Sequence, residues 1–131
     1  MKKWIFIILA MMLLTACGQK KEIVPEGSYM NITAQQAKEI MDTQTGYVIL
    51  DTRTQEEYDE GHIPGAILIP YDEILEKAET MLTDKNQLIL VYCRSGRRSK
   101  LAAEDLVKLG YTNIREFGGI IDWPYEISAE A

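Results

Sequence analysis

The sequence predicts an α/β domain with a mostly parallel sheet and helices on both faces. Two continuous apolar runs, residues 47–50 and 88–92, have the pattern of strands buried on both sides. Amphipathic segments with helical spacing separate these runs, and such strand–helix alternation is typical of parallel sheets. The chain has 131 residues, which is enough for one domain.

A capped helix precedes the first strong strand. Thr33 and Gln36 have the spacing of a capping box, and apolar residues recur at helical intervals behind them. Gly46 ends this helix just before the strand at residues 47–50. We expect the polar segment 51–60 to carry one short helical turn.

The rest of the domain repeats the alternation. The remaining strands are expected at the apolar runs 66–69, 88–92 and 113–117. The longer helices are expected at residues 71–82 and 99–109, where apolar residues share one face. Gly110 ends the second of these helices, and a final helical turn is expected around Trp123.

The N-terminus is typical of a secretion signal. Two lysines precede an uncharged apolar run at residues 4–14, which is shorter than the roughly 20 residues of a membrane-spanning helix and suits a signal peptide. The following segment, 14–17, resembles the lipobox of bacterial lipoproteins, in which Cys17 would be lipidated. We therefore expect a signal peptide at 1–16, a polar tether at 17–29 and a folded domain at 30–131, lipid-anchored and extracytoplasmic. An ordinary signal peptide with an incidental cysteine is the alternative.

Charge and cysteine content exclude several classes of protein. The formal net charge of -6 argues against a nucleic-acid binder, which needs basic residues to neutralise phosphates. Two cysteines and one histidine exclude a cysteine-rich zinc site and a disulfide framework. If Cys17 is acylated, Cys93 has no disulfide partner in its own chain. A thiol without a disulfide partner in an oxidising environment is expected either to be buried or to have a chemical role.

The loop that begins at Cys93 carries the candidate chemistry. Its other residues are Arg94, Ser95, Gly96, Arg97, Arg98 and Ser99. The loop amides can curl around one point if Gly96 adopts a positive φ, and the helix that follows adds about half a positive charge. These groups and the three arginines favour a reactive thiolate at the surface. In the alternative interpretations Cys93 is a buried core cysteine and Arg97 is only a surface charge.

Four stretches resemble single-domain rhodanese sulfurtransferases. The loop 93–99 resembles their active-site loop, which begins with the catalytic cysteine. Asp51-Thr52-Arg53 with Glu57 and the segment 61–66 resembles their N-terminal signature, and Gly118-Gly119 with Trp123 resembles the C-terminal one. The matches run in order from about residue 32 to residue 125. The resemblance implies a rhodanese-like three-layer domain with a central, mostly parallel five-stranded sheet.

The resemblance also implies a reaction. Cys93 would take a sulfane sulfur from an anionic donor such as thiosulfate, hold it as a persulfide, and pass it to a thiol or cyanide acceptor. The backbone of residues 94–99 would bind the outer sulfur, and Arg94, Arg97 or Arg98 would meet the donor. The resemblance implies no metal and no organic cofactor, and it names no protein partner.

Other residues of these motifs are expected to support the fold. Asp51, Arg53 and Glu57 are expected to form an internal ion pair rather than to act on a substrate. His62 is expected to be a structural hydrogen-bonding residue, and the alternative is a Cys–His dyad with Cys93.

Two other functions remain open from the sequence. An arsenate reductase or phosphatase could use a similar loop, although the related dual-specificity phosphatases have one more loop residue and an arginine six positions after the cysteine, where this chain has Ser99. A tethered, non-catalytic module that binds an anion or a partner protein is the second alternative. An intact Cys93 argues against it.

Overall fold

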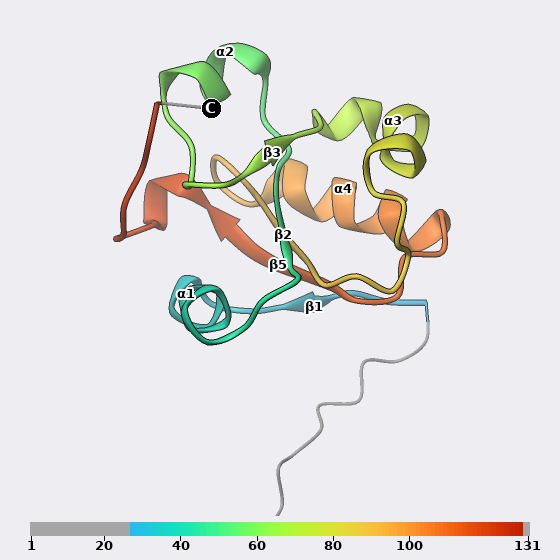
Figure 1. The fold of residues 1–131 in the computed structure, drawn as a ribbon. Coiled ribbons are helices and arrows are strands. Elements are labelled where there is room, and N and C mark those ends of the chain that lie inside the picture. The colour runs from blue at the N-terminus through green and yellow to red at the C-terminus, as the bar shows by residue number, and fades with distance from the viewer. Residues whose placement is uncertain (1–26, 130–131) are drawn as a thin grey trace, which may run out of the picture.

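The computed structural model describes residues 27–129 as one five-stranded sheet with helices on both faces (Figure 1). All strand pairs are parallel, and the strand order is β1-β5-β4-β2-β3. The strands are β1 (Met30–Asn31), β2 (Val48–Asp51), β3 (Ile67–Leu68), β4 (Ile89–Cys93) and β5 (Ile114–Gly119). The α/β class and the five strands are thus confirmed, and the sheet is entirely parallel.

Four α-helices and two 3-10 turns connect the strands. They are α1 (Ala34–Thr43), α2 (Gln55–Glu60), η1 (Tyr71–Glu73), α3 (Ile74–Met81), α4 (Arg97–Lys108) and η2 (Ile120–Asp122). Helices α3 and α4 cover one face of the sheet and α1 covers the other (Figure 1). Within residues 27–129, no helix is long and apolar enough to cross a membrane. The expected signal peptide and Cys17 lie outside the described residues.

Two capping boxes fix the starts of short helices. The Thr33 hydroxyl accepts the Gln36 N–H at 3.1 Å, and the Gln36 side chain accepts the Thr33 N–H at 2.9 Å, as predicted. A second box joins Thr54 and Glu57 at the start of α2. This second box places Glu57 at a defined position of α2.

Two predicted helices differ from expectation, and one strand was not predicted. Helix α4 begins at Arg97 rather than at residue 99, because Gly96 (φ 106°) turns the chain directly into the helix. The helix expected at 71–82 is divided into η1 and α3. Strand β1 could not be predicted, because its two residues show no periodicity and it forms by pairing with β5.

The sheet brings two predicted motifs to one edge. β4 lies at the centre of the sheet and pairs with β2, so the carboxyl ends of both strands meet. Asp51 ends β2 and Cys93 ends β4. The residues that follow these two strands form the candidate site.

Candidate active site

Cys93 ends the central strand and points toward the start of α4. Its Sγ accepts the backbone N–H of Gly96 at 2.9 Å, and the Ser99 hydroxyl lies 3.3 Å from the same sulfur. Among the described residues, Gly96 supplies the one backbone amide that donates to this sulfur. An amide and a helix N-terminus directed at Sγ favour negative charge there.

Cys93 is buried, with 1% of its surface exposed. The prediction of a thiol at the surface is wrong in this respect. We expected an exposed thiol because burying three arginines would be costly. Burial of the sulfur, however, does not require burial of the arginine side chains. Arg94 and Arg97 stay exposed although Cys93, in the same loop, is buried. A thiol can therefore be buried inside a strongly basic loop.

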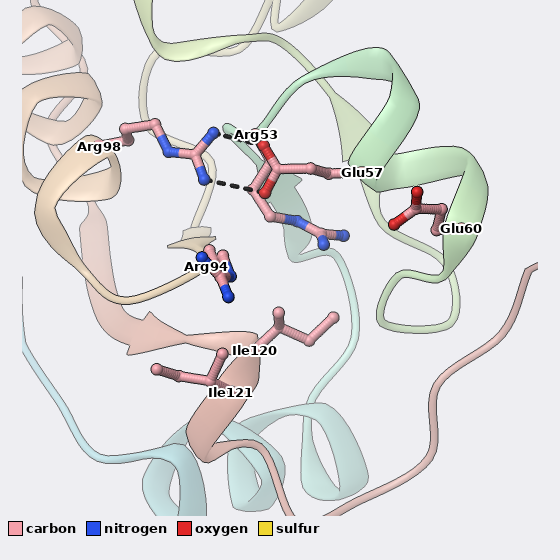
Figure 2. Close-up of a pocket in the computed structure, with 7 residues that line it drawn as sticks. All are labelled: Arg53, Glu57, Glu60, Arg94, Arg98, Ile120 and Ile121. Atoms are coloured by element: carbon pink, nitrogen blue, oxygen red, sulfur yellow. Dashed lines mark hydrogen bonds and ion pairs between the residues drawn. The ribbon is translucent and has the colours of Figure 1, made fainter.

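Arg98 is paired with Glu57 across the site (Figure 2). The two guanidinium nitrogens donate to the two carboxylate oxygens at 2.6 and 2.9 Å. The pair raises the pKa of Arg98 and, chiefly through the Arg98 hydrogen bonds, lowers the pKa of Glu57 to about 2. The prediction that Glu57 pairs within the Asp51–Arg53 group is therefore wrong. The capping box of α2 directs Glu57 toward the loop instead.

Asp51 and Arg53 form the predicted internal ion pair. Arg53 Nη2 donates to Asp51 Oδ2 at 2.7 Å, and both side chains are buried. Arg53 Nη2 also donates to the Gly61 carbonyl at 2.7 Å. The Tyr92 hydroxyl donates to Asp51 at 2.7 Å, and burial followed by the charge of Asp51 raises the pKa of Tyr92. Each charge is thus satisfied, as burial requires.

A cavity of about 440 Å³ adjoins the loop (Figure 2). Its walls combine three cations, two carboxylates and two apolar side chains, namely Arg53, Arg94, Arg98, Glu57, Glu60, Ile120 and Ile121. Cys93 does not line it. Arg53 and Arg98 have ion-pair partners, whereas within residues 27–129 the side chains of Arg94 and Glu60 have none. The cavity therefore offers one arginine ready to bind an anion.

The remaining predicted residues occupy distinct positions. Ser95 is exposed in the loop, and Arg97 is exposed as the first residue of α4. Arg97 does not line the cavity. The His62 ring lies with Nδ1 2.8 Å from the Tyr58 carbonyl and stacks on the Tyr58 ring, in keeping with a structural role.

Sequence reasoning missed Glu116 of β5. This carboxylate is 2% exposed, and its Oε1 accepts the Ser99 hydroxyl at 2.7 Å and the Gly118 N–H at 2.8 Å. The available signal was an acidic residue inside an apolar strand, just before the Gly118-Gly119 pair. Within residues 27–129, no group of three or more histidine, cysteine, aspartate or glutamate side chains could hold a metal ion.

Gly119 allows the loop and β5 to approach each other. A Cβ on Gly119 would lie 2.0 Å from the Arg94 carbonyl oxygen. This is far inside van der Waals contact, so only glycine fits at this position. The second glycine of the predicted C-terminal signature is therefore part of the site's construction.

Comparisons with known proteins agree with this geometry. A family model for the rhodanese-like domain matches residues 33–124. Thiosulfate sulfurtransferase PspE from Escherichia coli (strain K12) is 42% identical over 73 residues, which are 56% of this chain and 70% of PspE. Putative sulfur carrier protein YrkF from Bacillus subtilis (strain 168) is 36% identical over 97 residues, which are 73% of this chain and 51% of YrkF. The chain thus spans about half of this second relative.

A solved structure of a rhodanese with anions from E. coli superposes with a TM-score of 0.59 at 38% identity. The match covers 63% of this chain and 96% of that one. The cysteine loop, the parallel sheet and the family match all agree, and the chain belongs to the family of rhodanese-like domains, related to thiosulfate sulfurtransferases.

Proposed function

We propose that this protein moves a sulfane sulfur from an anionic donor such as thiosulfate to a thiophilic acceptor, through a persulfide on Cys93. One observation carries the proposal. The Cys93 sulfur accepts an amide hydrogen bond at the start of α4, beside a cavity lined by Arg94, which has no ion-pair partner among residues 27–129. Such a site stabilises an anionic sulfur and attracts an anionic donor.

In the first half-reaction the Cys93 thiolate attacks the outer sulfur of thiosulfate. The sulfur–sulfur bond of the donor breaks, and sulfite leaves with the bonding electron pair. The product is an anionic persulfide, so charge is balanced without an added proton. The Gly96 amide and the N-terminus of α4 favour negative charge on the attacking sulfur.

In the second half-reaction the acceptor attacks the outer sulfur of the persulfide. The Cys93 thiolate is the leaving group, and the product is thiocyanate from cyanide or a persulfide from a thiol. Neither half-reaction needs a metal or an organic cofactor, because no external electrons are required. A covalent intermediate of this kind predicts ping-pong kinetics.

The position of Ser99 favours this function over a phosphatase or an arsenate reductase. Ser99 stands where the phosphatase loop has its arginine, and its hydroxyl binds the buried Glu116 carboxylate. The cation that clamps the phosphate in those phosphatases is therefore absent from this position. A single added sulfur atom carries less negative charge than a phosphate or arsenate dianion, so it needs less compensation by cations.

We also propose that the domain is held outside the cytoplasm of a bacterium by lipid on Cys17. The support is the apolar run at residues 4–14, followed by small residues and the cysteine. The first strand of the folded domain begins at Met30, 13 positions after this anchor. The substrate would then be an extracytoplasmic sulfur compound.

Intact-mass spectrometry tests the sulfur transfer. Incubation with thiosulfate is expected to add the mass of one sulfur atom, and cyanide is expected to remove it as thiocyanate. Cys93→Ser should abolish both steps, whereas Cys17→Ser, which removes the other cysteine, should leave them intact. No added sulfur on the wild-type chain from thiosulfate, a polysulfide or a mercaptopyruvate-type donor would refute the proposal.

A further inference from the structure

A buried carboxylate that the proposed sulfur transfer does not use lies behind the Cys93 loop. Glu116 is 2% exposed and accepts two hydrogen bonds on Oε1, from the Ser99 hydroxyl and the Gly118 amide. Among the ion pairs of residues 27–129, none involves Glu116. Burying a charged carboxylate without a cation is costly. The cost is reduced when the carboxylate can take up a proton from a neighbouring group.

Ser99 connects this carboxylate to the nucleophile. Its Oγ lies 2.7 Å from Glu116 Oε1 and 3.3 Å from Cys93 Sγ. A hydroxyl has one proton to donate and two lone pairs to accept with. The shorter contact takes the Ser99 proton to Glu116, so a lone pair of Oγ can accept the Cys93 thiol proton. The three side chains form one continuous hydrogen-bonded chain.

The backbone of β5 is bent where this chain begins. Val91 pairs with Glu116, but Cys93 pairs with Gly119, so β5 holds one extra residue between these two pairs. Gly118 adopts φ +87° in this bulge and directs its N–H to the Glu116 carboxylate. Bulges of this kind redirect side chains beside active sites. The bulge holds Glu116 in contact with Ser99.

We propose that Glu116 is a positioning residue that holds the Cys93 proton while the sulfur is charged. The inference rests on Cys93 being the nucleophile of the proposed function. The S–H bond breaks, Ser99 Oγ takes that proton, and the original hydroxyl proton passes to Glu116 Oε1. The products are a thiolate, an intact hydroxyl and a carboxylic acid, so the total charge is unchanged. The proton returns by the same path when the thiol forms again.

Charged or ionisable groups lie near both ends of this hydrogen-bonded chain. The charge of Arg98 interacts with Cys93, and Arg98 is itself paired with Glu57. Glu116 and Glu104 both act on Tyr29, because burial and then the charges of Glu104 and Glu116 raise the pKa of Tyr29.

The pH dependence of Cys93 alkylation tests the proposal. The full chain reacts with iodoacetamide, an uncharged reagent, and peptide mass spectrometry measures the modification at Cys93. Wild type should show two rises in rate separated by a plateau, because on the plateau one proton is shared between Cys93 and Glu116, and the second rise follows the loss of that proton. Glu116→Gln should show a single rise, since glutamine keeps the shape and the Ser99 contact but holds no exchangeable carboxyl proton. Glu104→Gln, the control, should keep both rises.

A single rise in wild type, or two unchanged rises in Glu116→Gln, would overturn the inference. If Glu116→Gln does not fold, infrared spectroscopy of wild type with isotope-labelled glutamate decides instead. A protonated carboxylic acid band should be present at the pH of the plateau, and its absence would overturn the inference equally.

These readouts need no sulfur donor, so they separate the two proposals. A two-step profile without persulfide formation would support the proton exchange and refute the sulfurtransferase. Persulfide formation with a one-step profile would support the sulfurtransferase and refute the proton exchange.

Discussion

Glu57 holds both terminal nitrogens of Arg98, although the two residues lie 41 positions apart in sequence. The contact joins α2, which follows β2, to α4, which follows the cysteine loop (Figure 2). It also neutralises one of the three arginines of the cavity, and Asp51 neutralises a second. In the described part of the chain, the charge left over for a donor anion is that of Arg94.

Arg94→Gln is therefore expected to raise the KM for thiosulfate by about three- to fivefold with a smaller change in kcat, as for the loss of one exposed ion pair. Added salt should reduce the wild-type rate with thiosulfate in the same direction. Steady-state kinetics measure both effects. Arg97→Gln is the matched control, since Arg97 is also exposed but lies outside the cavity. Equal effects of the two variants would contradict the role of Arg94.

Glu57→Gln is expected to lower the free energy of unfolding by on the order of 1 kcal/mol at pH 7. Glutamine keeps the capping box of α2, so the change isolates the ion pair with Arg98. The folded-state pKa of Glu57 is lowered from 4.5 to about 2, so this stability is present above pH 4.5 and is lost as the pH falls toward 2. Urea unfolding at pH 7 and at pH 2 measures the difference.

Glu60→Gln serves as the comparison, because Glu60 lies on the same helix without an ion pair in the described residues. Its effect on unfolding should be near zero at both pH values. A Glu57→Gln effect of the same size at pH 7 and pH 2 would show that the ion pair is not its cause.

Gly119→Ala is expected to destabilise the domain by about 1–3 kcal/mol and to reduce sulfur loading of Cys93. The added methyl group would meet the Arg94 carbonyl at 2.0 Å, so the loop must shift away from β5. Thermal unfolding and intact-mass loading measure the two effects. Gly61→Ala is the control, because there the nearest atom is a flexible Ile127 side-chain carbon at 3.0 Å. A Gly119→Ala variant as stable and as reactive as wild type would contradict the close approach.

Cys17→Ala is expected to move the protein out of the membrane fraction, or to leave it with an uncleaved leader. Wild type should stay with the membrane after a salt wash, because a diacyl anchor binds through its chains rather than through charge. Cys93→Ser should fractionate as wild type does. Fractionation with lipid mass analysis checks this, and wild-type protein that is entirely soluble and without lipid would refute the anchor.

The sequence was sufficient for features that depend on neighbouring residues. The capping box of Thr33 and Gln36, the apolar central strands and the glycine before α4 all act within a few positions. The parallel topology follows from the same local order, since strands separated by helices return to the sheet in one direction. The meeting of Asp51 and Cys93 at one edge is a consequence of that topology.

Features that depend on distant contacts could not be predicted. Glu57 has an equally plausible partner nearby in sequence, and only the packing of α2 against the loop directs it to Arg98. Glu116 contacts Ser99 because of a bulge whose position depends on the pairing of β4 with β5. The burial of Cys93 likewise depends on how the loop folds, with the Gly96 amide donating to its sulfur, and residue composition does not specify this.

The two outer strands of the sheet, β1 and β3, contain two residues each. A sheet edge this short presents few free amide and carbonyl groups to another molecule. Strand addition between neighbouring copies, the usual first step of edge-to-edge aggregation, therefore has little backbone to build on. The domain is thus suited to high local concentration, the condition that crowding on a surface would impose.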